Sequence, residues 1–248
     1  MDQENSYFVG DAAGRMADHS DVDFHFSINI GVGFHTPEEF FLDLTGEAPG
    51  HKFEPVSFLQ GHLQQWSCTA NTPANGELDL LLKECRNTPI IVLVGGPGAG
   101  KSHFCDTFLH PLGYRQISLH KLGSQQDCIR EMKHALNQGI PVAIDNTNST
   151  VDSRRPWLSV AHEYKCRISA VYLDLLPDLC LHNDAFRALG GDVVNTEGRK
   201  VFPRASFLQL MENFEKPELS EGFSRVVSVG FQWMGSEEEL QIWRKYWV

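Results

Sequence analysis

The residues best suited to chemistry lie in one short, glycine-rich stretch. Residues 95–102 read GGPGAGKS and fit the pattern of glycine, four residues, glycine, lysine and serine. In such a turn the backbone amides point at one anion, the lysine reaches the outer phosphates and the serine hydroxyl holds magnesium. The stretch therefore predicts a binding site for ATP and Mg²⁺. We expect the phosphates to contact Gly96, Gly98, Ala99, Gly100, Lys101 and Ser102, and Mg²⁺ to bind Ser102.

The elements that position these residues follow from the hydrophobic pattern. The apolar run 90–94 predicts a buried strand ahead of the glycine turn, which disfavours a chance match. From residue 89 onward the expected strands and helices alternate, which favours a P-loop NTPase-type parallel sheet with helices on both faces. The fold class is therefore α/β. We expect further strands at 114–119, 141–145, 166–173 and 225–229, and helices at 124–139, 153–164, 177–189 and 204–214.

An acidic corner is predicted to face the glycine turn. Asp145 ends the expected strand 141–145 and precedes Asn146, Thr147 and Asn148. Ligands of parallel α/β sheets bind beyond the carboxyl ends of the strands, so Asp145 should lie near the phosphates. There it would position Mg²⁺ or an attacking hydroxyl. In the alternative interpretation, Asp145 and the two asparagines only bind backbone amides of a turn.

Basic and polar side chains of the second half form a further candidate group. Four lie at helical spacing on one expected helix, namely His182, Asn183, Phe186 and Arg187. Three cations follow in a polar segment and the start of the next helix, namely Arg199, Lys200 and Arg204. Together they would form a lid whose cations stabilise a transferring phosphoryl group, because that chemistry depends mainly on positioning and charge. A solvated charged face is the alternative for Arg199 and Lys200.

Two arginines at an expected helix start are a separate candidate. Arg154 and Arg155 open the helix that follows the acidic corner. The helix dipole disfavours cations at its amino end. A contact with a substrate phosphate would explain why they stand there.

The composition indicates one sizeable domain plus a smaller piece. The chain has 248 residues and a net charge of −11, and residues 1–88 hold 4 of its 21 Lys and Arg but 14 of its 32 Asp and Glu. The glycine-rich part is therefore close to neutral and free to carry a local basic patch. No apolar run reaches the roughly 18 residues of a membrane helix, and the N-terminus lacks signal-peptide features. Six scattered cysteines indicate reduced thiols, so we expect a soluble intracellular protein without a membrane partner.

The chain is predicted to have three regions. Residues 1–46 combine a short strand, an apolar segment and a helix start at Thr36, which are the closing elements of an α/β domain. Residues 47–88 are broken by glycine and proline, which predicts a connector lying on the following domain, with one short helix at 76–84. Residues 89–248 form the main domain.

The order of motifs along the whole chain is GDAAGR, GFxTPEEFF, GxPGAGKS, LGS, AIDNTN, SR, HN followed by FR, and FExPxLxEGF. This order resembles the C-terminal portion of the polynucleotide kinase 3′-phosphatase family. The resemblance implies a kinase of DNA-end repair that transfers the γ-phosphate of ATP to the 5′-hydroxyl of DNA or RNA, and hence a place in the nucleus or cytoplasm. It also implies that residues 1–46 are the incomplete tail of a haloacid-dehalogenase-like (HAD-like) phosphatase domain. Protein partners stay unknown.

Three positions depart from the kinase pattern of that family. His120 stands where the family has a general-base aspartate, Asp127 and Ala185 stand where it has arginines, and Arg187 is the nearest match for a lid cation. A neutral imidazole can accept a proton but cannot orient a hydroxyl with two anionic oxygens. We therefore assign the catalytic set to Lys101, His120, Asp145 and Arg187. A nucleotide-binding module without appreciable catalysis is the alternative, and oligomeric state is left open.

The resemblance is also incomplete for the phosphatase. The aspartate nucleophile of that fold lies in a DxDxT motif, whereas the DxD of this chain, Asp21 to Asp23, continues with Phe24 and His25. Asp11 matches a later acidic position of the family. Without an aspartyl nucleophile no phospho-enzyme forms, so we expect no 3′-phosphatase activity. A truncated form of a bifunctional enzyme remains a third interpretation.

Overall fold

A computed structural model describes the chain except for residues 1, 52, 67–81, 84–87, 197 and 248. It contains two compact units. One combines residues 1–68, 181–201 and 234–248, and the other combines residues 69–180 and 202–233. The predicted boundaries at residues 46 and 88 stay a prediction.

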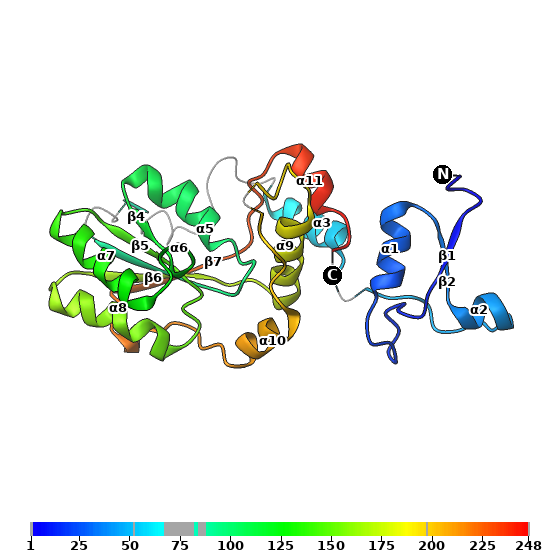
Figure 1. The fold of residues 1–248 in the computed structure, drawn as a ribbon, viewed down its shortest axis with the longest axis horizontal. Coiled ribbons are helices and arrows are strands. Elements are labelled where there is room, and N and C mark those ends of the chain that lie inside the picture. The colour runs from blue at the N-terminus through cyan, green and yellow to red at the C-terminus, as the bar shows by residue number, and fades with distance from the viewer. Residues whose placement is uncertain (1, 52, 67–81, 84–87, 197, 248) are drawn as a thin grey trace. The chain divides into compact units, whose positions relative to one another are not determined.

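The second unit is built on a five-stranded sheet of order β4-β5-β3-β6-β7, in which every neighbouring pair is parallel (Figure 1). The expected strands are all present, and the α/β fold class is confirmed. β3 lies at the centre, with β5 and β6 on its two sides. Because the chain runs to opposite sides from β3, a ligand crevice is expected beyond the carboxyl end of this strand. The strands are β3 (Ile90–Val94), β4 (Arg115–Ile117), β5 (Val142–Asp145), β6 (Ile168–Leu173) and β7 (Arg225–Val229).

Helices pack against this sheet in the order that the alternating pattern predicts. Alternate residues of β3 face a core to which α7 and α8 contribute Met132, Trp157 and Val160. The α5 helix is continued by a π-helical turn (Cys105–Leu109) and a short 3-10 turn (His110–Leu112). The helices of this region are α5 (Lys101–Phe104), α6 (Leu119–Leu122), α7 (Gln125–Asn137), α8 (Val151–Glu163), α9 (Pro177–Leu189) and α10 (Arg204–Glu212), followed by the 3-10 turn η4 (Leu219–Glu221).

The N-terminal segment forms a small β-α-β-α arrangement (Figure 1). Its two short strands are parallel, with Phe8 opposite Phe34. The predicted helix start is confirmed, because the Thr36 hydroxyl accepts from the Glu39 amide and the Glu39 carboxylate accepts from the Thr36 amide. The elements are β1 (Tyr7–Val9), α1 (Val22–Ile30), β2 (Gly33–His35) and α2 (Pro37–Leu42).

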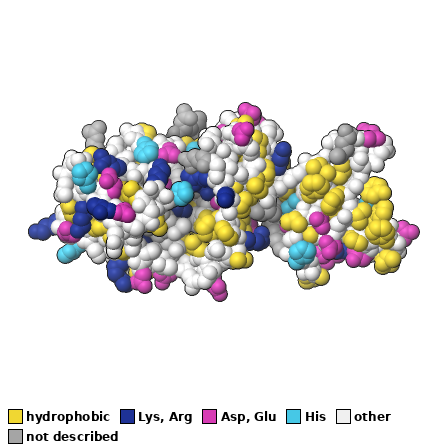
Figure 2. Space-filling view, viewed as in Figure 1, with side chains coloured by type: hydrophobic (Ala, Val, Ile, Leu, Met, Phe, Trp, Pro, Cys, Tyr) yellow, Lys and Arg dark blue, Asp and Glu magenta, His cyan; other side chains and the backbone are white. Residues whose placement is uncertain are grey.

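Hydrophobic side chains gather on the surface of this N-terminal segment (Figure 2). Those exposed include Tyr7, Phe26, Phe40, Phe41 and Leu42, and Phe41 is 72% exposed. A two-stranded sheet has too few strands to bury such residues by itself. The rings of Tyr7, Phe26, Phe40 and Phe41 therefore stay exposed in this segment.

One helix was not anticipated. The region predicted as a connector contains α3 (Pro55–Trp66), which begins where the Glu54 carboxylate accepts from the Ser57 amide. The proline stands at the first helical turn, a position that suits its fixed φ angle. The short helix predicted at 76–84 falls almost entirely outside the described residues. A final helix, α11 (Glu237–Trp243), closes the chain, and no helix in the described part is both long and apolar enough to cross a bilayer.

Candidate active site

The glycine turn after β3 depends on glycine for two different reasons. Gly98 and Gly100 adopt φ angles of 77° and 88°, which side chains disfavour. At Gly96 the limit is space, because a Cβ there would lie 3.2 Å from the Met211 sulfur and 3.7 Å from the Phe207 ring. The backbone of the turn is thus held against α10, and α5 begins directly after it at Lys101. This is the local geometry that a phosphate requires, with a helix start following a glycine turn.

The Lys101 side chain folds back over the turn. Its ammonium donates to the carbonyl oxygens of Gly95 at 2.8 Å and Gly96 at 2.7 Å. The cation therefore lies beside the same loop whose amides would face an anion. A positive charge at this place fits the binding of nucleotide phosphates.

Ser102 and Asp145 meet at the carboxyl ends of neighbouring strands. β3 and β5 are in register with Leu93 opposite Asp145, which brings the start of α5 next to the end of β5. The Ser102 hydroxyl donates to an Asp145 carboxylate oxygen at 2.7 Å, and Asp145 is 7% exposed. A hydroxyl and a carboxylate are ligands that Mg²⁺ accepts. The residues present thus fit a magnesium ion at this position.

A third side chain joins this pair and was not anticipated. The Gln116 amide donates to the same Asp145 oxygen at 2.7 Å, and the Lys121 ammonium donates to the Gln116 carbonyl at 2.6 Å. Gln116 lies on β4, the neighbour of β5. A single glutamine in a strand belongs to no motif, so only the strand order reveals its role. These contacts link the Asp145 carboxylate to a cation through one amide.

In the corner after β5, Asp145 belongs to the candidate site, whereas Asn146 and Asn148 hold the backbone. The Asn148 side chain donates to the Leu93 carbonyl at 2.7 Å and accepts from the Trp157 indole at 3.0 Å. It is 3% exposed and adopts a left-handed φ of 48°, a conformation that asparagine tolerates. Asn146 accepts from the Leu119 amide at 2.7 Å and so fixes the start of α6. Asn146 thus binds a backbone amide, as the alternative interpretation expects, whereas the Asn148 side chain binds backbone carbonyls and the Trp157 indole.

His120 lies on the exposed helix α6, which this contact attaches to the same corner. The structure thereby brings α6 next to the corner that contains Asp145. Among the described residues, no hydrogen bond joins His120 to Asp145. The nearby Cys105 is excluded as a nucleophile, because burial raises the pKa of its thiol to about 12, helped by the negative charge of Asp145. A thiol with such a pKa stays protonated near neutral pH.

The expectation that Arg154 contacts a substrate phosphate is wrong. Its side chain is fully buried and donates to both carboxylate oxygens of Glu221, at 2.8 and 2.7 Å. It also donates to the carbonyls of Asn148 and Glu215, each at 2.9 Å. These contacts join α8 to Glu215, to Glu221 of η4 and to the corner before α8 at Asn148. Arg155, which follows it, is exposed and pairs with Asp152 at 2.9 Å.

The cations predicted for a lid belong to the other compact unit from the glycine turn, apart from Arg204. The Arg187 guanidinium donates to the Asp184 carboxylate at 2.8 Å, one turn earlier on α9. Ala185 is 1% exposed. Ser124 caps α7 by accepting from the Asp127 amide, and the Asp127 carboxylate pairs with Arg130. Neither position presents a cation. The Asn195 side chain braces the following segment by hydrogen bonds with the backbone of Ala188 and Arg199.

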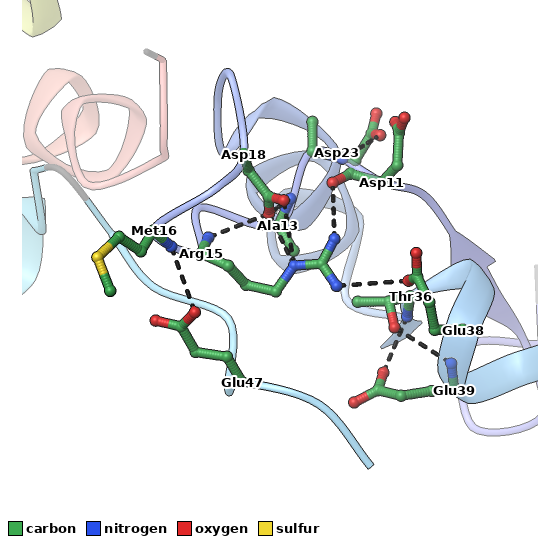
Figure 3. Close-up of polar contacts among 11 residues, drawn as sticks. Asp11, Ala13, Arg15, Met16, Asp18, Asp23, Thr36, Glu38, Glu39 and Glu47 are labelled. Carbon is green, nitrogen blue, oxygen red and sulfur yellow. Dashed lines mark hydrogen bonds and ion pairs between the residues drawn. The ribbon is translucent and has the colours of Figure 1, made fainter. Parts of the chain in front are cut away.

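The acidic residues of the N-terminal segment are engaged in local contacts (Figure 3). Arg15 donates to Asp18 at 2.9 Å and to the Asp11 carbonyl at 3.3 Å, and it reaches Glu38 at 3.4 Å. The hydrogen bond from Arg15 lowers the pKa of Asp18 to about 2. Asp23 accepts from the Ala12 amide at 3.1 Å. Its neighbour in the DxD sequence, Asp21, is 3% exposed and lies 3.5 Å from His25.

The fold and the site together define a class. A parallel α/β sheet with a GxxxxGKS turn after its central strand and an acid at the end of the neighbouring strand is a nucleotide-binding domain of the kinase-like P-loop type. Comparison with known families agrees. Residues 90–217, just over half of the chain, match the AAA domain family, and the chain belongs to it. Residues 1–41 match the family described as polynucleotide kinase 3 phosphatase.

Curated relatives confirm the predicted resemblance. The chain is 33% identical over 240 residues to the bifunctional polynucleotide phosphatase/kinase of Schizosaccharomyces pombe. The aligned region covers 97% of this chain and 54% of the relative. A protein of Acanthamoeba polyphaga mimivirus that carries the same name provisionally is 28% identical over 259 residues, with 97% and 59% covered. The chain thus spans about half the length of the curated relatives it matches. Among solved structures, Chaetomium thermophilum Kti12 in complex with ADP-AlF3 gives a TM-score of 0.44 at 16% identity, covering 63% of this chain and 96% of that one.

Proposed function

We propose that this chain is an ATP-dependent polynucleotide 5′-hydroxyl kinase with reduced turnover. The observation that carries the proposal is the hydrogen bond between Ser102 and Asp145 beside the glycine turn. It places a hydroxyl, a carboxylate and the Lys101 ammonium at the carboxyl end of the sheet, where such domains bind nucleotides. The name of the relative, bifunctional polynucleotide phosphatase/kinase, supports a polynucleotide as the substrate class. The 5′-hydroxyl end of DNA or RNA is what the family resemblance implies.

In the proposed reaction the 5′ oxygen of the nucleic acid attacks the γ-phosphorus of ATP. A bond forms between that oxygen and phosphorus, and the bond from phosphorus to the bridging oxygen breaks, so that ADP leaves with the electron pair. The hydroxyl proton passes to His120 or Asp145. Lys101 and Arg187 balance the charge on the phosphoryl oxygens, which is the main requirement of this chemistry. Ser102 and Asp145 would hold Mg²⁺, which supplies further positive charge at the phosphates.

The reduced turnover follows from the three positions that differ from the family pattern. An imidazole at residue 120 accepts a proton but lacks the paired anionic oxygens of an aspartate. Asp127 is negative and lies in the first turn of α7, where its amide donates to the Ser124 cap, and Ala185 is buried and neutral. Loss of an arginine that stabilises a phosphoryl group costs about 10³ to 10⁵ in rate. These same features favour the second candidate, a module that binds nucleotide and nucleic acid without transferring phosphate.

The proposal extends to the organisation of the chain. Residues 89–248 carry the kinase chemistry, residues 47–88 connect, and residues 1–46 correspond to the end of a phosphatase domain. Within this segment Asp21 and Asp23 stand outside a DxDxT motif, so neither is proposed as a phosphatase nucleophile. DNA-end repair, and therefore the nucleus, is the proposed setting.

Label transfer from γ-labelled ATP to a 5′-hydroxyl oligonucleotide tests the proposal. We expect slow transfer that needs Mg²⁺ and is abolished in Lys101→Ala. Lys133→Ala is the matched control, since that lysine of α7 pairs with Glu163 of α8, away from the glycine turn. A gain of transfer in His120→Asp would assign the defect to the base. ATP binding by the wild-type chain without any label transfer would support the module instead.

A further inference from the structure

The C-terminal helix makes direct polar contacts with the part of α9 that precedes Arg187. The Trp243 indole donates to the Asn183 side-chain carbonyl at 2.7 Å. The His182 ring nitrogen Nε2 lies 2.8 Å from the Trp243 backbone oxygen, and because a carbonyl only accepts, this nitrogen carries the proton. Two consecutive residues of α9 are thus bound by one residue of α11. Such a pair of contacts fixes both the position and the rotation of the helix at this point.

Aromatic packing closes around these hydrogen bonds. Trp243 has no exposed surface, and His182 is 1% exposed. The two rings meet edge to face with centroids 4.5 Å apart, and the Phe53 ring lies 4.9 Å from His182 and 6.3 Å from Trp243. Phe58 of α3 adds a further ring 6.3 Å from Trp243. The cluster therefore joins three segments that are far apart in the sequence, and it leaves Trp243 little freedom.

Arg187 follows this cluster by one helical turn. Residues 183 and 187 are four apart, so they lie on the same face of α9. The guanidinium is tied to the buried Asp184, and the Arg187 Nε atom is buried without a hydrogen-bond partner among the residues that the structure describes. An unsatisfied donor on a guanidinium is suited to an anionic acceptor. The direction of this group depends on how α9 is held.

We propose that Trp243 is a positioning residue for Arg187. By holding Asn183 and His182, it would fix the last turns of α9 so that the guanidinium is directed correctly for phosphoryl transfer. The inference rests on the proposed function, which assigns Arg187 to the phosphoryl group. Because displacement of such a group by about 1 Å costs about 10² in rate, we expect Trp243→Phe to lower kcat about 10-fold or more with little change in the KM for ATP.

Substitutions at Trp243, Asn183 and Arg187 test this role, with one at Trp247 as the control. Trp243→Phe keeps an aromatic ring and removes the indole donor. Trp247→Phe is the matched control, because the Trp247 indole, in the tail after α11, donates to the Ile242 carbonyl and not to α9. Asn183→Leu should lower kcat as Trp243→Phe does, and Asn183→Asp should retain activity because a carboxylate still accepts from the indole. In an Arg187→Ala background, Trp243→Phe should cause no further loss.

Hydrogen exchange of the amides at 184–189, measured without nucleotide, gives a readout independent of activity. We expect faster exchange in Trp243→Phe than in the wild type or Trp247→Phe. Unchanged exchange, unchanged kcat in an active enzyme, or an equal loss in the Arg187→Ala background would overturn the inference. If the wild-type chain transfers no phosphate, the proposed function fails, and the exchange experiment still decides whether Trp243 holds α9.

Discussion

Asp145 is the residue on which the proposed magnesium site depends. One carboxylate oxygen accepts from both Ser102 and Gln116. Asp145→Asn keeps the shape and one acceptor oxygen but removes the charge, so we expect Mg²⁺-dependent ATP binding and label transfer to fall at least about 10²-fold, in line with the loss of a group that stabilises the transition state. ATP binding without Mg²⁺ should change little. Isothermal titration with and without Mg²⁺ measures both, with the exposed Asp152→Asn as control.

Arg154 and Arg155 are adjacent in the sequence but have different roles in the structure. Removing Arg154 leaves the Glu221 carboxylate buried and unpaired, which costs about 3 to 5 kcal/mol of unfolding free energy. Arg155→Ala removes an exposed ion pair worth about 0 to 1 kcal/mol. We therefore expect Arg154→Ala, but not Arg155→Ala, to lower the denaturant midpoint strongly. A midpoint unchanged by Arg154→Ala, together with weaker nucleic-acid binding, would restore the substrate-contact hypothesis.

At the scale of elements, the sequence predicts most clearly where local signals and tertiary burial agree. The helix at 177–189 and the strand at 225–229 have the predicted bounds, since a proline opens the first and the second is an alternating apolar run. The sequence does not predict α3, because Pro55 and Gly61 are residue types that commonly interrupt helices. In the site, the turn and Asp145 follow from motif and strand order. Gln116 and the Arg154 to Glu221 pair do not, because their partners are distant in the sequence.

Gly61 offers a test of the unanticipated helix. It lies in the interior of α3, it is exposed, and a Cβ placed there would meet no atom within 4 Å. Gly61→Ala should stabilise the chain by about 0.5 to 1 kcal/mol, because alanine loses less backbone entropy in a helix. Thermal unfolding checks this, with Gly46→Ala as a control outside helices that also has open space. A lower melting temperature for Gly61→Ala would contradict the presence of a helix at this position.

For the whole molecule, the unit that contains α11 and residues 181–189 of α9 also includes the N-terminal segment. Asn29 of α1 exchanges two hydrogen bonds with the Tyr246 backbone, at 2.6 and 2.9 Å. The Tyr246 hydroxyl donates to Glu54 at 2.7 Å, and burial raises the pKa of this phenol. The tail after α11 is therefore tied to the segment that matches the phosphatase family. The C-terminal segment that holds α9 through Trp243 is therefore also bonded, through Tyr246, to Asn29 and Glu54.

The stability of the chain should depend on pH through His182 within this unit. Burial lowers the pKa of His182 to about 4, below its ordinary value of 6.5. Between these values the unfolded chain binds a proton that the folded chain does not, so the free energy of unfolding falls as the pH decreases from 6.5 to 4, by up to about 3 kcal/mol. Denaturant unfolding at several pH values measures this slope. His182→Asn keeps a donor for the Trp243 carbonyl and should flatten the slope, whereas the exposed His134→Asn should leave it unchanged. An equally steep slope in His182→Asn would contradict the assignment of the acid sensitivity to His182.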